Sequence, residues 1–70
     1  MKINELKKLA KSVIRFAESS ELEVKEIEMD GVVAVLIYNG DCNIISIQLY
    51  VQVDKDNDKW DFHEFLVSEL

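Results

Sequence analysis

The sequence predicts an α+β fold of the order α-β-β-β-α, a three-stranded antiparallel meander with two helices packed on one face. An apolar stripe of helical period fills the first 19 residues. Two Asx-Gly dipeptides then separate segments rich in Val and Ile, and a last apolar stretch follows residue 59. With 70 residues and no proline, the chain is expected to form a single domain over residues 1–70.

The first helix is predicted from apolar residues that recur at spacings of three and four, as on the buried face of an amphipathic helix. The stripe consists of Ile3, Leu6, Ala10, Val13 and Ala17. Lysine and arginine residues fall largely on the opposite side, and Ser19-Ser20 is the expected end of the helix.

The strands are predicted from Asp30-Gly31 and Asn39-Gly40, because both dipeptides suit the positive φ angles of a two-residue type I′ turn. The first turn would pair Met29 with Val32, and the second would pair Ala34 with Ile45. One face of the sheet would then be wholly apolar: Ile27, Met29, Val32, Ala34, Leu36, Ile45 and Ile47. The polar stretch 40–43 leaves a longer second loop open, and a slip there would exchange faces.

A second helix is predicted from about Lys59 to Leu70, with Asp58 as its N-cap and Asp61 in its first turn. Its aromatic residues would complete the core. Two helices on one face leave the other face bare, so we expect an apolar patch there that serves as a partner or homodimer contact. The residues of this patch are Val33, Val35, Ile37 and Ile44.

Charge favours a basic protein as the partner. Eight basic and 14 acidic residues give a net charge of −6. Residues 1–20 hold five basic and two acidic residues, so they carry +3 and the remaining fifty carry −9. An acidic body repels phosphates, so no direct nucleic-acid binding is expected. The expected partner-binding residues are Asp54, Asp56, Asp58, Asp61, Glu64, Glu26 and Glu28.

Catalytic and metal chemistry find little support in the sequence, and we expect no enzyme activity and no cofactor. Cys42 and His63 have no third group to orient them as a nucleophile and base. The Asp54, Asp56 and Asp58 triplet matches the start of a calcium loop, but Lys59 stands where the turn glycine belongs. A lone cysteine and the lack of an 18-residue apolar run predict a cytoplasmic protein without membrane contact.

The predicted element order resembles that of the double-stranded-RNA-binding domain. Such a domain carries a lysine cluster at the start of its second helix, however, where this chain has Asp58, Lys59, Asp61 and Glu64. A short acidic chain of this layout, opening Met-Lys-Ile-Asn-Glu-Leu, is also similar to small phage-encoded anti-CRISPR inhibitors. That resemblance implies an inhibitor whose acidic surface occupies a basic, nucleic-acid-binding site of its partner. The alternative function is a homodimeric or structural module that acts through the apolar sheet face.

Overall fold

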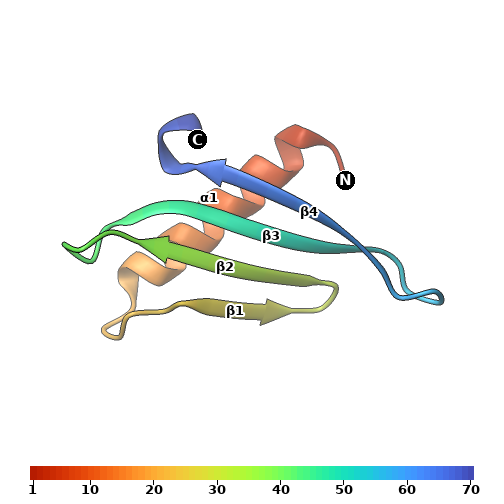
Figure 1. Ribbon diagram of the computed structural model, residues 1–70, viewed down its shortest axis with the longest axis horizontal. Coiled ribbons are helices and arrows are strands. Elements are labelled where there is room, and N and C mark those ends of the chain that lie inside the picture. The colour runs from red at the N-terminus through yellow and green to blue at the C-terminus, as the bar shows by residue number, and fades with distance from the viewer.

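The computed structural model describes residues 1–70 as two layers, one helix lying across one face of a four-stranded antiparallel sheet (Figure 1). The strands follow one another in chain order, β1-β2-β3-β4. The elements are α1 (Ile3–Ser19), β1 (Glu26–Met29), β2 (Val32–Tyr38), β3 (Ile44–Asp54), β4 (Lys59–Leu66) and a single 3-10 turn, η1 (Val67–Glu69). The α+β class is confirmed, whereas the prediction of three strands and two helices is wrong in its last element.

The core lies between α1 and the sheet. The apolar stripe of α1 is buried as its spacing predicts, except that Ile3 remains exposed at the start of the helix. From the sheet, the core receives alternate residues of the two central strands and one residue of β4. The buried residues are Leu6, Ala10, Val13, Ile14 and Ala17 of α1, with Val32, Ala34, Leu36, Ile47, Leu49, Val51 and Phe65 of the sheet.

The segment predicted as a second helix is a strand followed by the short turn η1. Residues 59–66 pair along β3, with Phe65 opposite Ile47 and Phe62 opposite Tyr50. Apolar residues occupy both faces of β4, so the segment lacks the strict alternation that marks a half-buried strand. Asp58 is not a helix cap but a turn residue in the left-handed region, with φ 52°. The α-β-β-β-α order behind the resemblance to the double-stranded-RNA-binding domain is therefore not the order observed.

The register of the first hairpin is confirmed, and that of the second is wrong by four residues. Met29 pairs with Val32 as expected, but Ala34 pairs with Leu49 rather than with Ile45. The second loop is longer than two residues: the Asn39 N–H donates to the Asn43 carbonyl, 2.9 Å away. Because four is an even number, Ile47 keeps its place on the core face. Ile45 falls at a bulge and is exposed.

The turn between β1 and β2 provides a test of backbone strain. Gly31 has φ +75°, and nothing lies within 4 Å of a Cβ built there, so only the backbone angle opposes a side chain. We expect Gly31→Ala to lower the free energy of unfolding by about 1 kcal/mol. Gly40→Ala is the matched control, because Gly40 has neither a positive φ nor a close neighbour. Urea unfolding measures the loss of stability in both variants. Equal losses would contradict the conclusion that the positive φ of Gly31 opposes a side chain there.

Candidate functional site

The face of the sheet opposite α1, which we call the open face, has no layer of this chain over it (Figure 1). Side chains alternate between the two faces of a strand, so the register defines its members. They are Glu26 and Glu28 of β1, Val33, Val35 and Ile37 of β2, Ser46, Gln48, Tyr50 and Gln52 of β3, and Trp60, Phe62, Glu64 and Leu66 of β4. None of these positions carries Lys or Arg.

Three aromatic side chains form one end of the open face. The rings of Tyr50 and Phe62 lie 5.1 Å apart between centroids, tilted by 52°. Tyr50 is 37% exposed, Trp60 41% and Phe62 52%. Trp60 and Phe62 are among the aromatic residues predicted to complete the core, and for these two that prediction is wrong. Their alternation at residues 60 and 62 is the signal that could have located this surface.

Trp60 is held in place by a neighbouring carboxylate. Its indole Nε1 donates to Asp58 Oδ1 over 2.7 Å, and Gln52 Nε2 donates to the same oxygen over 3.1 Å. The ring is therefore fixed by a charge-assisted hydrogen bond while much of its surface stays in water. A large side chain with its rotamer already fixed loses little entropy on binding, which favours a contact role.

Carboxylates stand at both sides of the same face. Glu26 and Glu28 lie on β1, whereas Glu64 lies on β4 and accepts a hydrogen bond of 3.0 Å from Gln48 Nε2. Three strand spacings separate β1 from β4, so the backbones of these two strands lie about 14 Å apart. The register thus brings part of the predicted acidic set onto the apolar patch of Val33, Val35 and Ile37.

Ile44, the fourth residue of the predicted apolar patch, does not lie on the open face. It pairs with Tyr38 beyond the bulge in β3, and both side chains pack against the core cluster. The bulge changes the phase of the strand by one residue, which is why simple alternation placed Ile44 on the wrong side.

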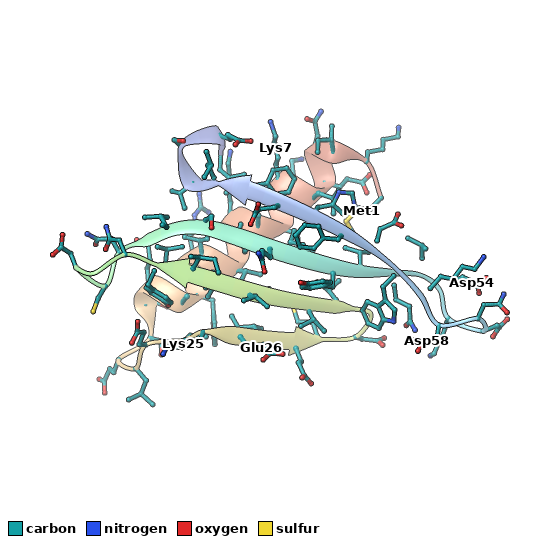
Figure 2. All side chains as sticks on the ribbon, viewed as in Figure 1. Met1, Lys7, Lys25, Glu26, Asp54 and Asp58 are labelled. Atoms are coloured by element: carbon teal, nitrogen blue, oxygen red, sulfur yellow. The ribbon has the colours of Figure 1, made fainter.

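The aspartates of the β3–β4 hairpin form a separate tip at one end of the molecule, and Figure 2 shows Asp54 and Asp58 there, away from Glu26. Asp54 Oδ1 accepts bonds from the N–H groups of Asp56 and Asn57, and its Oδ2 accepts one from Asn57 Nδ2. Asp54 and Asp58 therefore use their carboxylates within the chain. Asp61 lies on the helix side of β4, opposite Val51.

These hydrogen bonds lower the pKa of Asp54, most strongly through the side chain of Asn57 and next through its backbone N–H. A lowered folded-state pKa means that the carboxylate stabilises the hairpin above the ordinary pKa of 3.8, and that this contribution is lost as pH falls through the lower value. We expect Asp54→Asn to reduce the pH dependence of the urea midpoint between about pH 5 and pH 2. Asp56→Asn is the control, and an equal reduction there would contradict the assignment.

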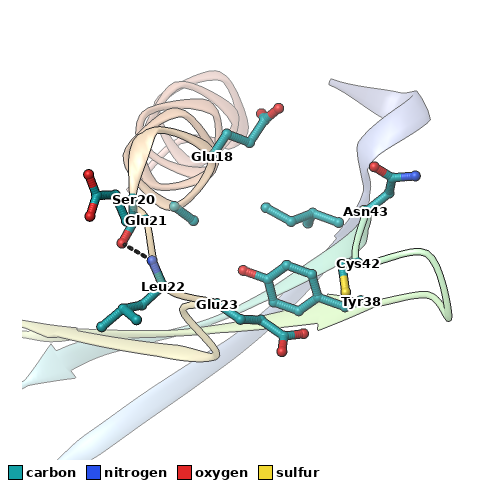
Figure 3. A pocket seen from close by; sticks show the side chains of 10 residues that line it. Glu18, Ser20, Glu21, Leu22, Glu23, Tyr38, Cys42 and Asn43 are labelled. Carbon is teal, nitrogen blue, oxygen red and sulfur yellow. Dashed lines mark hydrogen bonds between the residues drawn. The ribbon is translucent and has the colours of Figure 1, made fainter.

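A pocket of about 350 Å³ lies at the C-terminal end of α1 (Figure 3). Glu18, Glu21 and Glu23 line it, together with Tyr38, whose hydroxyl donates to the Val24 carbonyl. Cys42 lies at its wall, whereas His63 lies on β4 opposite Leu49 and is not part of it. No three His, Cys, Asp or Glu side chains in the chain are grouped so that they could hold a metal ion.

No family model, no curated protein and no solved structure matches this chain. The function is therefore inferred from the chemistry of the chain's own surface. None of the helices is both long enough and apolar enough to cross a membrane.

Proposed function

We propose that this chain is a protein-interaction module that binds a basic surface of a partner protein through its open face. One observation carries the proposal: a single uncovered face combines three exposed aromatic rings with three carboxylates and has no cationic strand residue. Exposed apolar patches of this kind mark interaction sites, and their charge selects the partner.

The chemistry of the open face suits arginine and lysine side chains. Guanidinium groups stack on aromatic rings, and they form two parallel hydrogen bonds with a carboxylate. Trp60 is the best anchor, because aromatic residues with fixed rotamers dominate binding energy in many interfaces. Glu26, Glu28 and Glu64 would pair with the basic groups around it.

Binding of this kind would make the chain an inhibitor. A basic protein surface that binds phosphates cannot bind nucleic acid while this chain occupies it, which is the mode implied by the resemblance to anti-CRISPR proteins. Asp54, Asp56 and Asp58 extend from the same end of the sheet as Trp60, and we propose that they add electrostatic steering to the contact.

Self-association through the open face is the competing function. Two open faces brought together would bury six glutamates without a cation to pair them, which is costly. We therefore expect light scattering to give the mass of a monomer at high concentration. A dimer that Phe62→Ser dissociates would favour the homodimeric module instead.

The test uses immobilised chain, an extract of candidate host cells and DNA as a competitor. We expect the captured protein to be basic, to elute with salt, and to be displaced by double-stranded DNA. With that protein purified, binding should shift the emission of Trp60, the single tryptophan, to shorter wavelength.

Matched variants test whether the open face, rather than the helix side of the sheet or the hairpin tip, binds the partner. Phe62→Ser and Glu64→Gln should each weaken capture at least fivefold, whereas Asp61→Asn, on the helix side of the same strand, should leave it unchanged. Loss of capture only when Asp54, Asp56 and Asp58 are changed to Asn would move the site to the hairpin tip and overturn the assignment to the open face.

A further inference from the structure

The outer edge of β1 has unpaired backbone groups. The Leu36 N–H donates to the Lys25 carbonyl, and bonding toward a neighbour alternates along an antiparallel strand. The N–H and C=O groups of Lys25, Ile27 and Met29 therefore point toward β2. Those of Glu26 and Glu28 point away from the sheet. Such an edge is a template on which another strand can add.

An apolar groove runs beside this edge on the helix side of the sheet. It has a volume of about 330 Å³. Its lining residues are Leu9, Ser12, Val13 and Phe16 of α1 and Ile27 and Met29 of β1, all of them hydrophobic except Ser12. Phe16 is 61% exposed and Met29 39%. The chain thus leaves a phenylalanine and a methionine exposed to water next to the unpaired edge of β1.

The charge at the edge selects what can occupy it. Glu26 and Glu28 stand on the open face, so an added strand would place alternate side chains opposite these two carboxylates. Its intervening side chains would enter the groove. A second copy of β1 is disfavoured there, because it would set glutamate against glutamate. An occupant with basic residues on one face and apolar residues on the other satisfies both requirements.

We propose that β1 binds, by strand addition, an extended segment of a partner in which basic and apolar residues alternate. Its backbone bonds to Glu26 and Glu28, its basic side chains pair with their carboxylates, and its apolar side chains fill the groove beside Phe16. This inference rests on the proposed function in taking the partner to be basic. It shares Glu26 and Glu28 with the open face, but it uses a strand edge and a groove rather than the aromatic rings and Glu64, so peptide binding at β1 and the Phe62 and Glu64 variants test the two separately.

The experiment uses a synthetic eight-residue peptide that alternates valine with lysine or arginine. In hydrogen exchange followed by NMR, we expect it to protect the amides of Glu26 and Glu28 at least tenfold, and to leave those of Phe62 and Glu64 unchanged. A peptide of the same composition with its valines in one block should give no protection at β1, because it cannot place apolar and basic groups on opposite faces.

Two variants test the groove and the charges. Phe16→Ser removes an exposed side chain and should weaken binding of the alternating peptide about fivefold. Phe62→Ser, on the open face, should leave that binding unchanged. Changing Glu26 and Glu28 to Lys should weaken it about tenfold and allow binding of a peptide that alternates valine with glutamate. Protection at β4 instead, equal binding of the blocked peptide, or no protection at all would overturn strand addition at β1. None of these results would affect the open-face variants of the proposed function.

Discussion

Leu49→Ala should reduce the free energy of unfolding by about 3–5 kcal/mol, because it removes a completely buried side chain and leaves a cavity between α1 and the sheet. A chain of 70 residues has a total stability of about 3.5–10 kcal/mol. The variant should therefore lose at least about a third of that stability, which urea unfolding measures as a lower midpoint, with the far-ultraviolet signals of α1 and the β-sheet lost together.

The control for this prediction is Leu22→Ala, the same chemical change at a side chain that is 79% exposed. Its free energy of unfolding should stay within about 0.5 kcal/mol of that of the unchanged chain. If the two variants lost equal stability, the core would not lie where the buried residues place it.

His63→Pro should cost about 2–4 kcal/mol, because it removes a backbone N–H that faces β3 and leaves the carbonyl of Leu49 without its partner. The direction of the His63 N–H follows from the hydrogen bond that the Gln52 N–H donates to the Gly31 carbonyl. Because bonding alternates along an antiparallel strand, the backbone groups of the even residues of β3 point toward β2 and those of the odd residues point toward β4. Leu49 and His63 are directly opposite each other in that ladder.

Glu64→Pro is the matched variant one residue along. Its N–H points outward from the free edge of β4, so proline removes no sheet hydrogen bond and we expect a loss of at most about 1 kcal/mol. Thermal unfolding of the two variants shows whether residues 59–66 form a strand or a helix. A helix over residues 59–70 would be damaged about equally by proline at either position, so similar losses would contradict β4.

The predicted acidic and apolar surfaces were located separately in the sequence, and only the sheet joins them. Glu26 and Glu64 are 38 positions apart in the chain, yet they end the same row across four strands through Val35 and Gln48. Nothing local to either residue indicates this. The aromatic part of the site was missed for the same reason: Trp60 and Phe62 were assigned to a helix that would have buried them.

The sequence alone determined α1, the first hairpin and the separation of a basic helix from an acidic remainder, because each depends on residues close together in the chain. An apolar stripe of period 3.6 and an Asp30-Gly31 turn act locally and allow one outcome. The tertiary structure decided the last strand and the second register. Residues 59–66 have apolar groups on both faces and fit either period, and it is pairing with the 11-residue β3 that makes them a strand. That pairing also moves the aromatic rings from the core to the surface on which the proposed function depends.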